Sequence, residues 1–191
     1  MSSANPLHQE VDATLSALYI KEESSTTTFL VKSIYTDSTL HTYYGAPAEQ
    51  WMTVIVPKGN DKTSTSTINF SFEIFEKTPT RLAEGLFLRF NLSDPVSWRV
   101  NSLDGYIDPF DIVPGGNHHL HGFSNDSTGG GISATKKNGQ TLQITSVTIG
   151  LAGFGKPSYL PAPVWSNATD PNEGANFNLL NNGCMYLYIK H

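Results

Sequence analysis

Apolar and polar residues alternate along much of this chain, and the alternation predicts a series of β-strands. It is clearest in residues 64–77, and residues 81–92 continue in the same way. Successive side chains of a strand point to opposite faces of a sheet, so this spacing is typical of half-buried strands. Further strands are expected at residues 24–35, 50–57, 98–103, 141–151 and 184–190.

Residues 10–20 fit two different structures. Val11, Leu15, Leu18 and Tyr19 would share one face of a helix, but the same span can also pair as a strand. A short amphipathic segment does not distinguish a helix from a strand by its spacing alone. A short N-terminal helix and an N-terminal strand therefore both remain open.

Clusters of Gly, Pro and Asn divide the expected strands, as in SDPVS, PGGN, NDSTGGG and KKNGQ. No long helical periodicity follows residue 20. Frequent short strands separated by such turns are typical of an antiparallel sandwich or a related barrel. The predicted fold is therefore all-β, an antiparallel β-sandwich with long loops. At 191 residues the chain is most simply one domain, residues 1–191.

Composition and charge restrict the partners of this protein. Charged residues make up 15% of the chain, against about 25% in average domains, and the net charge is −5. Lys and Arg are scattered, whereas nucleic-acid binding needs a concentrated basic surface. No apolar run approaches the ~20 residues that span a bilayer. We therefore expect neither nucleic acid nor membrane as a partner.

The N-terminus has neither a basic start nor a continuous apolar core, so we expect no signal peptide and a cytoplasmic protein. Secretion is not excluded, but the four N-x-S/T sequons are little evidence for it, because roughly three would arise by chance in a chain this rich in Ser and Thr. Cys184 is the only cysteine, which excludes an intrachain disulfide. The sequons lie at Asn69, Asn91, Asn125 and Asn167.

The segment from Asp108 to His121 holds the most metal-like group of side chains, including His118 and His119. Imidazoles and carboxylates are suitable zinc ligands. Strand alternation would place His119 and His121 on one face and His118 on the other, and the spacing matches no established zinc pattern. We therefore favour hydrogen-bonded structural roles over a metal site, with ligand contact as an alternative. No metal or other cofactor is assigned.

The acidic residues near this segment are better explained by structural roles than by catalytic ones. Asp104 and Asp108 could be compared with a glycosidase pair, but their neighbours Gly105 and Pro109 favour turn formation. No nucleophile elbow, phosphate loop or dinucleotide fingerprint occurs. The sequence therefore predicts no catalytic residues.

Aromatic residues offer a second kind of site. Trp51 and Trp98 lie in strand patterns and are expected in the core. Tyr159 and Trp165 lie in the Pro-rich segment 153–174, where either loop packing or ligand contact would account for them. Exposed rings can stack on the apolar faces of sugars while nearby amides bind the hydroxyls, so these loops suit carbohydrate.

Four stretches of this chain resemble a mainly fungal, glycoside hydrolase family 38-like (alpha-mannosidase-related) family. They are YGAPAEQW (44–51), FEKTPTRLAEGLFLRF (75–90), WRVNSLDGYIDPFDIVPGGNHHLHGF (98–123) and NFNLLNN (176–182). In that family the matching region is β-rich and follows the catalytic domain. The zinc ligands of alpha-mannosidases belong to that domain, so the resemblance implies no catalytic or metal-binding residue here.

These observations favour a stand-alone, lectin-like β-sandwich that binds a glycan or small sugar without catalysis. One alternative is an accessory part of, or an enzyme derived from, a family 38-like hydrolase. Another is a structural or defence-related interaction protein, and self-association into a homo-oligomer also remains open. The expected ligand-binding residues are Asp108, Asn117, His119, His121, Tyr159 and Trp165.

Overall fold

The computed structural model divides the chain into two compact units, Met1–Arg81 and Leu82–His191. Within the residues that the structure describes, twelve β-strands form three antiparallel sheets, and one short helix accompanies them. The predicted all-β class is confirmed, while the prediction of one domain over residues 1–191 stays a prediction. The structure describes residues 10–59, 66–80, 82, 84–92, 94–102, 105–111, 121–122, 130–146, 150–155 and 174–182.

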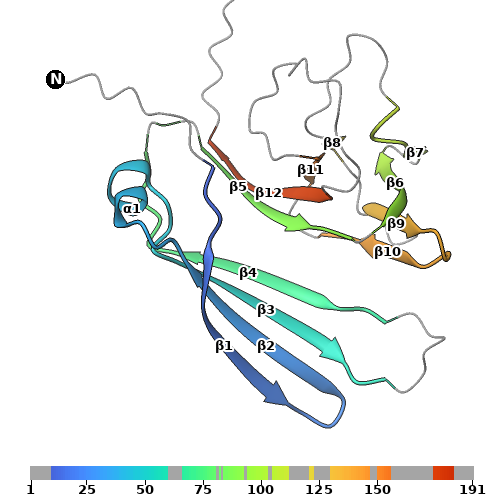
Figure 1. The fold of residues 1–191 in the computed structure, drawn as a ribbon, viewed down its shortest axis with the longest axis horizontal. Helices are drawn as coiled ribbons and strands as arrows, with labels where there is room; N and C mark the ends of the chain where they lie inside the picture. The colour runs from blue at the N-terminus through green and yellow to red at the C-terminus, as the bar shows by residue number, and fades with distance from the viewer. Residues whose placement is uncertain are drawn as a thin grey trace, which may run out of the picture. The chain divides into compact units, whose positions relative to one another are not determined.

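The first unit is an antiparallel meander in the order β1-β2-β3-β4, visible as the blue to green sheet of Figure 1. Residues 10–20, for which helix and strand were both open, contribute to an edge strand. The strands predicted at 24–35, 50–57 and 64–77 are confirmed as the other three. The bounds are β1 Thr14–Glu22, β2 Thr26–Ile34, β3 Glu49–Pro57 and β4 Asn69–Phe75.

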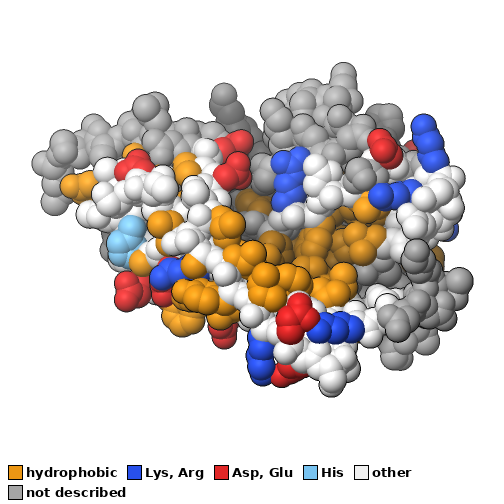
Figure 2. Space-filling model, turned by 60° about the horizontal axis from the view of Figure 1, so that its bottom comes forward, with side chains coloured by type: hydrophobic (Ala, Val, Ile, Leu, Met, Phe, Trp, Pro, Cys, Tyr) orange, Lys and Arg blue, Asp and Glu red, His pale blue; other side chains and the backbone are white. Residues whose placement is uncertain are grey.

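The strand register collects apolar side chains on one face of this meander. One cross-strand row joins Ile20, Phe29, Val54 and Phe70. A second row, two residues further along, joins Leu18, Val31, Met52 and Phe72. Ile20 and Phe70 are 56% and 47% exposed. Hydrophobic side chains accordingly form a broad part of the surface that Figure 2 presents.

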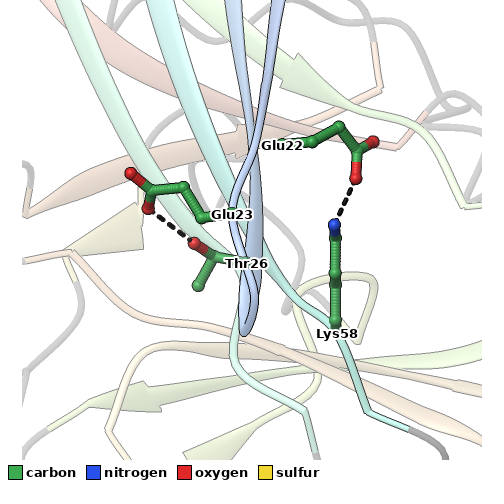
Figure 3. Close-up of polar contacts among 4 residues, drawn as sticks. All are labelled: Glu22, Glu23, Thr26 and Lys58. Atoms are coloured by element: carbon green, nitrogen blue, oxygen red, sulfur yellow. Dashed lines mark hydrogen bonds and ion pairs between the residues drawn. The ribbon is translucent and has the colours of Figure 1, made fainter.

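Polar contacts fix the turn between β1 and β2, as Figure 3 shows. The Glu23 backbone N–H donates to the Thr26 carbonyl over 2.9 Å. The Thr26 hydroxyl donates to the Glu23 carboxylate over 3.2 Å (Figure 3). Lys58, just after β3, forms an ion pair with Glu22 at the end of β1. These contacts help to set the register of the hairpin. They add little to its stability, because solvent weakens exposed ion pairs.

The helix α1, Ser38–Tyr44, connects β2 to β3. Asp37 caps its first turn, accepting from the Thr39 backbone N–H over 2.8 Å and from the Thr39 hydroxyl over 2.7 Å. Gly45 ends the helix at a φ of 73°, a left-handed conformation that favours glycine. Both capping residues are readable in the sequence, yet seven residues are too few for the helical periodicity to stand out.

The second unit contains two four-stranded sheets, in the orders β10-β9-β6-β7 and β5-β12-β11-β8. The first sheet is built from β6 Pro95–Ser102, β7 Gly105–Ile107, β9 Ile132–Lys136 and β10 Thr141–Ile144. The second sheet is built from β5 Glu84–Phe90, β8 His121–Gly122, β11 Leu151–Phe154 and β12 Ala175–Asn182.

Both sheets of the second unit contribute equally to one hydrophobic core, which makes this unit sandwich-like. The first sheet supplies Trp98, Val100, Ile132 and Ala134, and the second supplies Ala152, Phe154, Ala175 and Phe177. The Trp98 and Phe154 rings meet edge to face with centroids 5.5 Å apart. This contact couples the two sheets through their largest side chains, in a geometry that aromatic pairs prefer.

The tryptophan predictions had different outcomes. Trp98 is 1% exposed, so its predicted core position is confirmed. The same prediction was wrong for Trp51, which is only half-buried. Its ring stacks on Tyr19 at a centroid distance of 6.2 Å, and the Lys32 ammonium lies 5.2 Å from the ring centroid. Trp51 therefore belongs to the mixed polar face of the meander, because alternation along β3 separates it from Met52.

The strand predictions for the second unit were partly confirmed. Residues 81–92, 98–103 and 141–151 contribute to strands β5, β6, β10 and β11. Strand β12 was not expected, because it is rich in Asn, a residue depleted in strands. Residues 184–190 lie outside the described residues.

Candidate functional site: a polar hollow on one sheet

The six residues expected to bind ligand are mostly outside the described part of the chain. Asn117, His119, Tyr159 and Trp165 all lie there, and of His121 only the backbone is described, paired with Ala152. Asp108 is exposed, and its carboxylate accepts from the Phe110 backbone N–H over 2.8 Å. This contact confirms the predicted turn-forming role of Asp108. The expected ligand site itself stays a prediction.

A different site is visible on the sheet β10-β9-β6-β7. Alternation turns Trp98 and Val100 of β6 into the core, and Ile132 and Ala134 of β9 with them. The residues between them, on the other face, are polar and line a hollow of about 570 Å³. We call this feature the polar hollow; its polar lining comprises Ser97, Arg99, Tyr106, Ser133, Thr135, Thr141 and Gln143.

The strand register sets these side chains in two rows. Thr141, Thr135 and Ser97 form one cross-strand row. Gln143, Ser133 and Arg99 form the next. Neighbouring strands lie about 4.8 Å apart, and residues two apart on one strand are separated by roughly 7 Å. A ligand the size of one sugar ring can therefore reach both rows at once.

Two hydrogen bonds orient side chains of the lining and leave some of their donors and acceptors for a ligand. The hydroxyls of Thr135 and Thr141 lie 3.2 Å apart, so one of them donates a hydrogen bond to the other. Since each hydroxyl carries a proton, the pair keeps a second donor for a ligand. The Gln143 amide nitrogen donates to the Gly130 carbonyl over 3.1 Å, which leaves the amide oxygen to serve as an acceptor. The hollow thus offers both donors and acceptors in fixed places.

Gly131 brings the backbone close to the hollow's lining. Its φ is 96°, and a Cβ built there would lie 2.1 Å from the Ile144 carbonyl oxygen. The Gly131 carbonyl accepts from the Asn101 backbone N–H over 2.9 Å. Only glycine allows β9 to begin this close to β10, and Gly131 itself lines the hollow.

Tyr106 supplies the aromatic surface of the hollow. It lies on β7 opposite Asn101 of β6 and is 58% exposed. A tyrosine offers an apolar ring and a hydroxyl that both donates and accepts. Combined with the hydroxyl rows, it gives the hollow one aromatic side chain among many hydrogen-bonding groups.

The described lining of the polar hollow is mostly uncharged and hydrogen-bonding. It contains hydroxyls, an amide, a phenol and one guanidinium, and none of these described lining residues is a carboxylate or an imidazole. Within the residues that the structure describes, no group of three or more His, Cys, Asp or Glu could hold a metal ion. Nor is any helix in this described portion long and apolar enough to cross a membrane.

Comparisons of this chain with protein-family models, with curated proteins and with solved structures gave no match. The resemblance to a family 38-like family therefore stays a prediction.

Sequence reasoning missed the polar hollow because its residue types are ordinary for a solvent-facing strand surface. Ser97 and Arg99 alternate with core residues, as do Ser133 and Thr135. The available signal was this alternation of short hydroxyl side chains in three separate strands. Their meeting on one face depends on the order β10-β9-β6-β7, which the sequence pattern does not specify.

Proposed function

We propose that this protein binds carbohydrate through the polar hollow and does so without catalysing a reaction. The observation that supports the proposal is the pair of hydrogen-bonding rows on the sheet face, accompanied by an exposed tyrosine. Sugar hydroxyls both donate and accept, and the Ser, Thr and Gln side chains of the hollow complement them in both roles.

The polarity of the hollow favours a hydrated ligand over an apolar one. Sites for drug-like molecules and most cofactors are enclosed and lined mainly by hydrophobic side chains. The polar hollow is open, and hydroxyl groups dominate its lining. A sugar would exchange water for these groups at little desolvation cost, and its apolar face would lie on the ring of Tyr106.

Strands rather than loops hold this proposed site. Thr135 of β9 pairs with Ser97 on one side and Thr141 on the other, so ladder hydrogen bonds fix all three. Such a preformed arrangement loses little conformational entropy on binding. The loop residues expected from the sequence, including Tyr159 and Trp165, stay candidates for additional contacts.

A glycan array probed with the full chain tests this proposal. We expect wild-type protein to bind at least one glycan, and a Thr135→Val, Thr141→Val double variant to lose about tenfold or more in affinity for it. Thr28→Val is the matched control, because Thr28 lies on a strand of the first unit. Absence of binding to every glycan at millimolar concentration would contradict the proposal.

The alternative of a hydrolase-derived enzyme makes a different prediction for the same glycans. An enzyme would convert the bound glycan into products, whereas a lectin-like protein would release it unchanged. Chromatography of the glycan after prolonged incubation separates these two outcomes.

A further inference from the structure

Arg99 is the one charged side chain among the described lining residues of the polar hollow. Its neighbours on the same face of β6 are Ser97 and Asn101, two residues before and after it. Across the sheet it pairs with Ser133 of β9, beyond which lies Gln143 of β10. All four neighbours are neutral, so the sheet itself supplies no counter-charge.

Two lysines of the meander differ from Arg99, because each of them has an acidic partner. On the meander, Lys32 has its counter-ion in Glu49, and Lys58 has one in Glu22. Arg99 forms no ion pair with any residue of the described ranges, and it is exposed. A guanidinium is thus presented to solvent from within a hollow that is otherwise lined with neutral hydrogen-bonding groups.

A guanidinium has a geometric preference among anions. Its planar donors match the two oxygens of a carboxylate, and the resulting pair of charge-assisted hydrogen bonds is stronger than neutral ones. The hydroxyls of Ser97 and Ser133 lie beside Arg99 on the sheet and suit the hydroxyls of the same ligand. The hollow therefore combines features for two groups of one molecule, a carboxylate and a set of hydroxyls.

We propose that the ligand of the polar hollow is an acidic sugar, whose carboxylate binds Arg99 while its hydroxyls bind the Ser and Thr rows. This inference rests on the proposed carbohydrate-binding function and names the class of sugar. The protein as a whole carries a net charge of −5, so long-range attraction does not favour acidic ligands. Selectivity for the acid must come from direct contact with Arg99.

Calorimetric titration of the full chain tests the inference. The probes are glucuronic acid, galacturonic acid and N-acetylneuraminic acid, with glucose and galactose as neutral parents and glucose 6-sulfate as a differently shaped anion. We expect at least one uronic acid to bind about tenfold or more tightly than its neutral parent, as charge-assisted hydrogen bonds require.

Variants at Arg99 assign that preference to one side chain. Arg99→Gln should reduce the acid-to-neutral ratio to near one, and Arg99→Lys should keep part of it, since an ammonium is a point charge without the planar fork. The matched control is Arg89→Gln, which removes the same charge from an exposed position of β5 in the other sheet. It should leave the ratio unchanged. Because Arg99 is exposed, its variants should melt at the wild-type temperature.

The outcomes separate this inference from the proposed function. Equal affinity for acidic and neutral sugars would overturn the acid inference and leave carbohydrate binding intact. The acid inference would also be overturned if Arg99→Gln kept the preference for the acid, or if glucose 6-sulfate bound more tightly than both uronic acids. Failure of all six sugars and of the glycan array would overturn carbohydrate binding itself.

Discussion

Alanine at Gly131 should destabilise the second unit much more than alanine at Gly139. Both glycines have positive φ, 96° and 82° respectively. A Cβ at Gly131 would lie 2.1 Å from the Ile144 carbonyl oxygen and 3.2 Å from the Thr145 Cα, whereas nothing lies within 4 Å of a Cβ at Gly139. The two substitutions therefore share backbone strain and differ in steric overlap.

These contacts set the expected magnitudes. A non-glycine residue in the left-handed region costs about 1–2 kcal/mol, which is the full effect expected for Gly139→Ala. At Gly131 the clash is with backbone, so β9 and β10 must separate, and overpacking of this kind adds about 1–3 kcal/mol. Gly131→Ala should thus lower the free energy of unfolding by roughly 2–5 kcal/mol.

Urea unfolding, followed by tryptophan fluorescence, measures both values because Trp98 is buried in the core of the same unit. Gly174→Ala gives an independent check, since its Cβ would lie 2.2 Å from the Phe90 carbonyl oxygen in the other sheet. If Gly131→Ala and Gly139→Ala lowered the stability equally, the close approach of β9 to β10 would be refuted.

Three further predictions concern single side chains. Tyr106→Ala should weaken sugar binding about 3- to 10-fold, while Tyr106→Phe, which keeps the ring, should cost less, as titration calorimetry can measure. Burial raises the pKa of Tyr35, so above about pH 10 the folded state keeps a proton that the unfolded chain loses. The free energy of unfolding should therefore fall as the pH rises above about 10, and it should fall less in Tyr35→Phe. Hydrogen bonds from the Thr39 hydroxyl and backbone N–H lower the pKa of Asp37. Asp37→Ala should therefore be less stable than wild type at neutral pH, and urea titrations should show the difference narrowing as pH falls below about 4.

The fold class was predictable where large apolar residues alternate with polar ones. Residues 64–77 and 81–92 show this alternation, and each contains a strand. Strand β12 also alternates, with Phe177 in the core between Asn176 and Asn178. Its asparagines kept the segment from being predicted as a strand, because Asn is depleted in β-strands.

The candidate site was much less predictable, for a physical reason. Histidines and aromatic residues attract attention because few of them occur, whereas Ser97, Ser133 and Thr135 look like any solvent-facing strand residues. Their chemistry arises only when β6 and β9 pair in register and bring the hydroxyls together. Sequence spacing reports on neighbours within a strand, and the polar hollow consists of neighbours across strands.

The most direct test of carbohydrate binding at the polar hollow is an amide chemical-shift titration of the full chain with the best ligand from the glycan array. We expect the largest shifts at Ser97, Arg99, Ser133 and Thr135, with little change in β2 and β3 of the first unit. Binding that shifted only residues away from β6, β9 and β10 would contradict it.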